Sequence, residues 1–202
     1  MRLFSSPTTP FGRKATVVMI EAGLADRVVV VQASGTPLDP GTMPVAQNPL
    51  GKIPALELDD GRALYDSRVI CRYLDHLAGT GLYPEGETLW EVLTLEATAH
   101  GITEAALLMA YEGRLRPEEL RYEPWVEGQW QKVARTLDAV ESRWMDLLEG
   151  PLTAAHIAMG CALGYLDFRH YARGWREGHP RLSAWEADFA ARPAMQATKP
   201  VA

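Results

Sequence analysis

The fold of this chain is decided by the stretch Asn48-Pro49-Leu50-Gly51-Lys52-Ile53-Pro54-Ala55-Leu56 and by the pair Asp66-Ser67 that follows it. The first four residues are typical of a turn, and Pro54 comes second in the strand that the turn feeds. Proline donates no ladder hydrogen bond, so we expect it on an edge strand, at a strand start, or after a cis peptide bond. We predict that the Ile53–Pro54 peptide is cis.

Asp66-Ser67 is typical of a helix start, where an acid and a hydroxyl stand beside unpaired backbone N–H groups. Lys52 adds a cation shortly before this pair in the sequence. Together these segments supply a cation, an exposed strand edge, an anion-binding helix end and a carboxylate. A zwitterionic peptide would find a partner for each of its groups in that set.

On these residues the chain resembles the glutathione S-transferase superfamily, whose glutathione-binding signature is similar to NPLGKIPAL followed by Asp-Ser. The run from Ser6 to Lys14 and the segment from Gly164 to Arg169 are also similar to bacterial members. The likeness covers nearly the whole chain. It implies an α/β N-terminal thioredoxin-like domain followed by an all-α C-terminal domain.

The residues of the first part alternate strand and helix. We expect a thioredoxin-like domain over 1–78, a linker over 79–86, and a helical domain over 87–202. The β-branched run Val28 to Val31 predicts a fully buried parallel strand. The remaining expected elements of the first domain are a strand at 2–4, a helix from Pro10, a loop over 34–51 with a short helix near 43–46, strands at 53–58 and 62–64 around the turn Asp59-Asp60-Gly61, and a helix over 66–78.

Beyond the linker the strand pattern stops, and apolar residues recur at helical spacing. We expect helices over 87–113 and 124–149, a third from Thr153 to about Ala172, and a short one near 181–191. His156 stands where family members usually carry an aspartate, three residues after the capping Thr153. A neutral imidazole can accept a hydrogen bond there, so we expect the pKa of His156 to be lowered.

Composition limits the class of protein. The 202 residues are 47% hydrophobic and 23% charged, with a net charge of −6, which is typical of a globular chain and makes nucleic acid an improbable partner. No apolar run is long enough to span a membrane. Cys71 and Cys161 form no C-x-x-C pair, so the cytoplasm is the expected location.

A thiolate would be held in the turn that leads into the helix at Pro10. Ser6, Thr8 and Thr9 place hydroxyls before a helix N-terminus, where unpaired N–H groups and the helix dipole favour an anion. Two alignments with the family are possible. One selects Thr9 as the donor to the glutathione sulfur and the other selects Thr8, with Ser6 as a third choice; we favour Thr9, then Thr8. Capping of the helix alone is the simpler role for Thr9.

The resemblance also implies roles for the signature residues. Lys52 meets the glycyl carboxylate, Ile53 before Pro54 pairs its backbone with the cysteinyl unit, and Asp66 and Ser67 hold the γ-glutamyl end. Asp66 replaces the glutamate that is commoner at its position, which shortens its reach.

Other polar residues give weaker indications. Arg13 and Lys14 could add positive potential near the thiolate, but we expect them on a solvated face. The histidines show no metal-ligand spacing, so we expect no metal. Family resemblance places the second-substrate pocket between the domains, with candidates from the helical domain at Met109, Tyr111, Tyr165, Arg169 and Trp175.

The resemblance therefore implies a glutathione transferase that binds glutathione, stabilises its thiolate and presents it to an electrophilic small molecule, acting as a homodimer in detoxification. One alternative is a glutathione-dependent disulfide reductase. Another is a non-catalytic binding or regulatory protein with the same fold.

Overall fold

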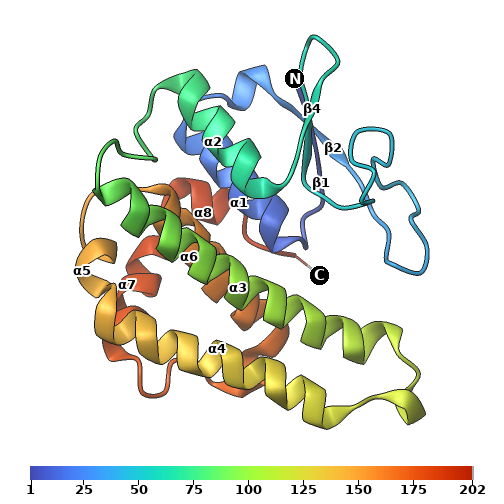
Figure 1. Ribbon diagram of the computed structural model, residues 1–202, viewed down its shortest axis with the longest axis vertical. Coiled ribbons are helices and arrows are strands. Elements are labelled where there is room, and N and C mark those ends of the chain that lie inside the picture. The colour runs from blue at the N-terminus through green and yellow to red at the C-terminus, as the bar shows by residue number, and fades with distance from the viewer. Residues whose placement is uncertain (202) are drawn as a thin grey trace. The chain divides into compact units, whose positions relative to one another are not determined.

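The computed structural model describes residues 1–201, which divide into two compact units (Figure 1). The first unit comprises Met1–Pro84 together with the segment that begins at Pro193, and the second comprises Glu85–Arg192. The first unit contains a small mixed sheet with helices, and the second is helical. The predicted α/β thioredoxin-like domain and all-α domain are thus confirmed as fold classes.

The sheet of the first unit has the order β2-β1-β3-β4. Strand β1 pairs in parallel with β2 and antiparallel with β3, and β3 pairs antiparallel with β4. The expected parallel strand is therefore present, but the prediction that it is fully buried was wrong: Val29 is 66% and Val30 37% exposed. These side chains are exposed because β2 lies at the edge of the sheet, where it hydrogen bonds only to β1. The strands span Arg2–Ser5 (β1), Val29–Gln32 (β2), Ala55–Glu57 (β3) and Ala63–Leu64 (β4).

The predicted hairpin between β3 and β4 is present, with shorter strands than expected. Leu58 N–H donates to the Arg62 carbonyl at 2.8 Å, and Gly61 takes a φ of 83°, which favours glycine. The short helix expected near 43–46 is absent from the described residues; turns occupy that stretch. Prolines recur through the loop at 37, 40, 44 and 49, and each removes an N–H that a helix would use.

Helices α1 (Pro10–Glu21) and α2 (Ser67–Ala78) lie on the same side of the sheet in Figure 1 and pack against each other. Helix α1 starts at a proline, which tolerates the first helical position. Helix α2 is capped at one end by Asp66 and ends at Gly79 in the left-handed region. Their buried faces meet the sheet residues Leu3 and Leu56, which are fully buried.

A helix that the sequence reading missed, α8 (Pro193–Ala197), packs on α1. Arg13 is only 8% exposed and donates from Nη2 to the Met195 carbonyl at 3.1 Å. Lys14 is buried too, at 4% exposed. The expectation of a solvated face for these two cations was wrong. For Arg13 the reason is that the chain returns at residue 193 and α8 meets its guanidinium. The expected domain limits at 78 and 87 stay a prediction.

The second unit is built around α3 (Thr88–Leu115) and α6 (Ala154–His170), which pack along each other. The expected helix over 124–149 is interrupted at Trp144, whose φ of −121° and ψ of 6° leave the helical region. The other helices of this unit are α4 (Glu123–Arg143), α5 (Met145–Leu148) and α7 (Pro180–Ala190), and short 3₁₀ turns span Ala25–Arg27 in the first unit and Glu118–Leu120 and Tyr171–Arg173 in the second.

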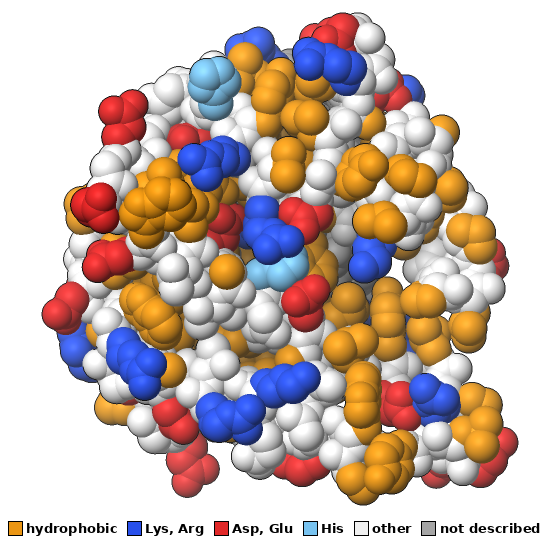
Figure 2. Space-filling view, in the orientation of Figure 1, with side chains coloured by type: hydrophobic (Ala, Val, Ile, Leu, Met, Phe, Trp, Pro, Cys, Tyr) orange, Lys and Arg blue, Asp and Glu red, His pale blue; other side chains and the backbone are white. Residues whose placement is uncertain are grey.

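The surface carries charges of both signs. On the face shown in Figure 2, lysine and arginine side chains are scattered among acidic ones. Among helices of the described residues, none combines the length and apolar character needed to cross a membrane.

Candidate functional site

Four chain segments meet at one edge of the sheet in the first unit. The register pairs Ser5 with Gln32 and Phe4 with Ala55, while Leu56 pairs with Leu64. The ends of β1, β2 and β4 and the start of β3 therefore lie at the same edge. Helices α1 and α2 both begin there, and neither has an acidic residue in its first helical turn. Two positive helix ends thus point to one region, which favours an anion.

The turn before β3 is organised by Asn48, which is 2% exposed. Its side chain donates from Nδ2 to the Lys52 carbonyl at 2.8 Å and accepts from Leu50 N–H at 3.1 Å. Gly51 takes a φ of 61° within this turn. Sequence reasoning gave Asn48 no role, although an asparagine two residues before an unpaired turn N–H is a known turn former.

The Ile53–Pro54 peptide is cis, as predicted. Ile53 precedes β3, and within residues 1–201 neither its N–H nor its carbonyl has a hydrogen-bond partner. The Lys52 side chain is exposed and has no acidic partner in the described chain. An unpaired backbone unit next to a cation can accept one residue of an extended peptide as an added strand.

At the start of α2, Asp66 and Ser67 differ in their hydrogen-bond partners. Asp66 caps the helix by accepting from Arg68 N–H at 2.9 Å, and its carboxylate also pairs with the Arg68 guanidinium at 2.9 Å. Ser67 is 1% exposed, and its Oγ has no hydrogen-bond partner among the described residues. A buried hydroxyl without a partner is uncommon and calls for an explanation such as a ligand. The Tyr65–Asp66 peptide is also cis.

The simpler alternative for Thr9, capping of α1 by its side chain, is not supported by the hydrogen bonds at this helix end. Thr9 occupies the N-cap position, but its side chain makes no capping hydrogen bond. Its methyl group faces Gly12, where an added Cβ would lie 2.4 Å from Thr9 Cγ2 and 2.1 Å from Ser5 Oγ. The packing of Gly12 therefore fixes the methyl of Thr9 and leaves its hydroxyl unused at the helix end.

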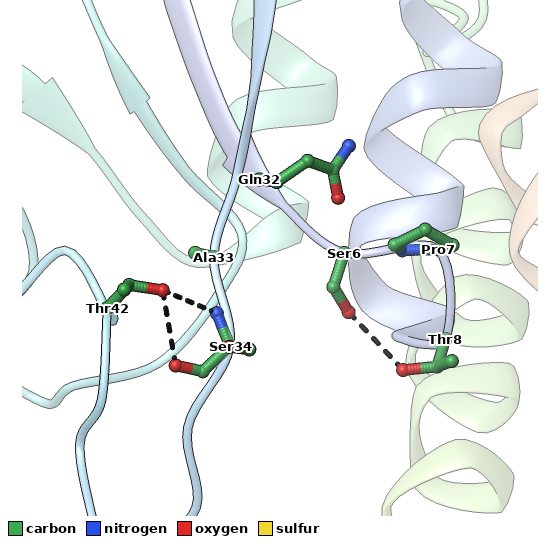
Figure 3. A pocket seen from close by; sticks show the side chains of 7 residues that line it. All are labelled: Ser6, Pro7, Thr8, Gln32, Ala33, Ser34 and Thr42. Atoms are coloured by element: carbon green, nitrogen blue, oxygen red, sulfur yellow. Dashed lines mark hydrogen bonds between the residues drawn. The ribbon is translucent and has the colours of Figure 1, made fainter.

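Ser6 and Thr8 line a cavity of about 360 Å³ at the same sheet edge (Figure 3). Their hydroxyl oxygens lie 3.3 Å apart, within hydrogen-bonding distance of each other. The opposite wall comes from the end of β2 and the loop that follows, where Thr42 Oγ1 accepts from Ser34 N–H at 3.0 Å. Thr9 does not line this cavity. The remaining lining residues, which sequence reasoning missed for want of any motif, are Pro7, Gln32, Ala33, Ser34 and Thr42.

Four of the five candidates for the second substrate lie on α3 and α6 of the second unit, and Trp175 lies between α6 and α7. Met109 and Tyr165 are buried, at 4% and 3% exposed, and Tyr111 and Arg169 are half-buried. Burial raises the pKa of Tyr165, and the Arg169 guanidinium opposes that shift. Trp175 is buried and donates from its indole to Asp167 at 2.8 Å, which is a structural contact.

His156 completes a capping box at the start of α6. Its Nδ1 lies 3.1 Å from Thr153 N–H, which donates to it, and 2.9 Å from Thr153 Oγ1. Burial holds the pKa of His156 below its usual value, as expected. Within residues 1–201 no group of histidine, cysteine or acidic side chains could hold a metal ion.

Comparison with known proteins decides the family. The model of the glutathione S-transferase N-terminal domain matches residues 8–77, and that of the glutathione S-transferase C-terminal domain matches residues 123–188. The chain belongs to the glutathione S-transferase family. The transferase fold of this family therefore accounts for both units.

Bacterial members of this glutathione S-transferase family resemble the chain along its whole length. The uncharacterized GST-like protein YibF of Escherichia coli K12 is 31% identical over 99% of this chain and 98% of its own. A glutathione transferase family member from Pseudomonas fluorescens Pf-5, solved with bound glutathione, is 43% identical with a TM-score of 0.97, over 100% of this chain and 99% of that one. A second structure from that organism holds S-(propanoic acid)-glutathione, at 43% identity, a TM-score of 0.93 and full coverage of both chains.

Proposed function

We propose that this protein is a glutathione transferase that binds glutathione at the sheet edge of the first unit and activates its thiol. The observation that carries the proposal is the buried Ser67 hydroxyl, which has no partner within the described chain, beside the unpaired backbone of Ile53. Bound glutathione in structures of relatives 43% and 37% identical supports the ligand.

Each part of glutathione has a counterpart in this site. In the proposal Lys52 binds the glycyl carboxylate and the backbone of Ile53, held before Pro54, pairs with the cysteinyl unit. Ser67 and the N-terminus of α2 bind the γ-glutamyl carboxylate, and Asp66 binds its ammonium. The Asp66 carboxylate keeps capacity for this contact beside Arg68, because two oxygens offer about four acceptor positions.

The sulfur lies, in this proposal, at the N-terminus of α1, where Thr9 donates to it. The unused hydroxyl of Thr9 supports that choice, whereas Thr8 and Ser6 already pair with each other. The thiolate then forms a bond to the electrophilic carbon, and the leaving group departs with the bonding electrons. The enzyme supplies binding, orientation and a stabilised nucleophile, and the glutathione is consumed.

The proposal is tested by calorimetric titration with glutathione, followed by turnover of an aryl halide and of hydroxyethyl disulfide. Binding with aryl halide turnover supports the transferase. Binding with disulfide turnover alone would favour the reductase, and binding with neither would favour a regulatory protein. Absence of glutathione binding would refute the proposal.

Ser67→Ala should raise the Kd for glutathione at least about tenfold, because hydrogen bonds to charged groups contribute roughly 1.5–3 kcal/mol. The folding stability of the variant should change little, since the Ser67 hydroxyl makes no hydrogen bond to the described residues. Ser183→Ala is the matched control, as Ser183 Oγ also lacks a partner there but lies in the second unit. Equal affinities for the two variants would remove Ser67 from the site.

We further propose that the protein is a cytoplasmic homodimer. Exposed apolar side chains on α2 and α3, Val69 at 48% and Trp90 at 62%, support a contact surface on these helices. Cys71 and Cys161 form no disulfide, which fits a reducing compartment. Sedimentation should give twice the monomer mass; Trp90→Glu should lower it, and a monomer at all concentrations would contradict the dimer.

A further inference from the structure

The inference concerns the cavity of about 360 Å³ that Ser6 and Thr8 line, which is formed entirely by residues of the first unit. Its volume falls in the range of about 300–1,000 Å³ that is usual for small-molecule sites. Among the described residues that line it none is charged, and their polar side chains are four hydroxyls and the amide of Gln32. Such a lining favours an uncharged polar ligand over an ion.

The order of the strands places this cavity beside the proposed position of the glutathione sulfur. The strands follow each other across the sheet in the order β2-β1-β3-β4. The cavity lies where β1 and β2 end, Ile53 precedes β3, and Ser67 follows β4. In the proposal the sulfur lies at the N-terminus of α1, to which the turn after β1 leads. The cavity is therefore on the side of the sulfur away from the γ-glutamyl end, where it can receive the electrophile.

The hydroxyls of Ser6 and Thr8 together present a polarised donor. Their oxygens lie 3.3 Å apart, so that one O–H can donate to the other, and the accepting hydroxyl keeps its own proton for a third group. Hydrogen bonds in such a chain strengthen one another. Gln32, the last residue of β2, extends its amide toward Ser6 in Figure 3, and within residues 1–201 that amide has no hydrogen-bond partner. Donors from two strand ends thus face the same space, where one oxygen atom can accept from both.

We propose that this cavity binds the carbonyl oxygen of an α,β-unsaturated carbonyl compound, with Gln32 and the Ser6–Thr8 pair as its donors. This inference rests on the proposed glutathione transferase function and names the class of electrophile. Donors that are fixed around an oxygen on which negative charge develops stabilise the transition state more than the ground state.

The reaction in this case is a conjugate addition, in which no group leaves. The thiolate sulfur forms a bond to the β-carbon, and the electron pair of the C=C bond shifts to the bond between the α-carbon and the carbonyl carbon. The π pair of the C=O bond moves onto the oxygen, where the donors of the cavity stabilise it. The α-carbon then takes a proton from water, which replaces the proton that the glutathione thiol released, and the carbonyl forms again.

The test compares 4-phenyl-3-buten-2-one, an unsaturated ketone, with benzyl chloride, which carries no oxygen and releases chloride. Thr8→Val and Gln32→Leu should each lower the ratio of kcat/KM for the ketone to that for the chloride at least about tenfold, because loss of one oxyanion donor costs about 10²–10³ in rate. Thr8→Ser, which keeps the hydroxyl, should restore most of the ratio. Gln32→Glu should lower the ratio further than Gln32→Leu, because an ionised carboxylate only accepts hydrogen bonds.

Thr16→Val is the matched control, since the Thr16 hydroxyl belongs to the first unit, lies outside the cavity lining and donates to the Gly12 carbonyl at 3.0 Å. It should leave the ratio unchanged. An unchanged ratio in Thr8→Val or in Gln32→Leu would overturn the inference, and so would equal losses in Thr8→Val and Thr16→Val. A wild type that converts benzyl chloride or the aryl halide but not the ketone would overturn the inference and leave the proposed function intact. If no electrophile is converted, the proposed function falls and the inference with it.

Discussion

Removing the hydroxyl of Thr9 should raise the pKa of glutathione bound to the protein. The best substitution is Thr9→Val, because valine keeps the methyl group that packs beside Gly12 and loses only the oxygen. That oxygen caps nothing in the structure, so its loss should cost the fold little. Pro10 has no N–H to take over its role.

The magnitude follows from two contributions. A hydroxyl bond to a thiolate is charge-assisted and contributes roughly 1.5–3 kcal/mol, and the end of α1 adds about 0.3–1 kcal/mol. At ~1.4 kcal/mol per pKa unit, the two together bring the free thiol from about 8.5 to roughly 6–7. Thr9→Val removes the larger contribution, so the pKa should rise by about one to two units.

Ultraviolet titration of the thiolate measures this pKa in the wild type, Thr9→Val, Thr8→Val and Ser6→Ala. Only Thr9→Val should shift it, while the Kd for glutathione stays nearly constant, since the proposed site holds the peptide through Lys52, Ile53 and Ser67. A shift in Thr8→Val or Ser6→Ala with none in Thr9→Val would refute the reasoning and move the sulfur to the cavity. No shift in any variant would assign the thiolate to backbone N–H groups.

Two further predictions concern stability. Gly12→Ala should lower the free energy of unfolding by about 1–2 kcal/mol, because the overpacking penalty of ~1–3 kcal/mol outweighs the better helix propensity of alanine. The control is Gly101→Ala, where an added Cβ meets open space. In chemical denaturation this control should show a higher free energy of unfolding. As the pH falls below about 6.5, the unfolded chain binds a proton that buried His156 resists, so stability should decline down to the lowered folded pKa. His156→Asn, which keeps an acceptor for Thr153 N–H, should flatten this decline without abolishing it, because burial also lowers the pKa of His170; an unchanged slope would contradict the assignment.

Local patterns predicted the local parts of this structure. The turn from Asn48 to Gly51, the cis bond before Pro54 and the helix start at Asp66 depend on neighbouring residues, so short motifs encode them. Burial was harder to predict, because the apolar run that includes Val29 has the same pattern at the centre of a sheet as at its edge. Strand order, which decides between these positions, depends on pairings far apart in the chain.

The candidate site shows the same division. The motifs identified Ser67 and Thr9 as candidates. The observation that supports them is that their hydroxyls lack a hydrogen-bond partner among the described residues, and this depends on packing. Arg13 could not be placed from sequence at all, since the carbonyl that it meets is 182 residues away. Arg169 became a candidate only through its segment, whereas the burial of its Nε without a hydrogen-bond partner among the described residues depends on packing.

The return of α8 to α1 has a consequence for biosynthesis. Residues 1–84 leave the ribosome well before Met195, whose carbonyl accepts the hydrogen bond of buried Arg13. The nascent first unit therefore carries a cation that its own contiguous residues do not cover until translation has passed the whole second unit. The first unit can therefore be completed only after residues 85–192 have been synthesised. A ribosome that stalls within that stretch would leave α1 without the contact that α8 makes with it.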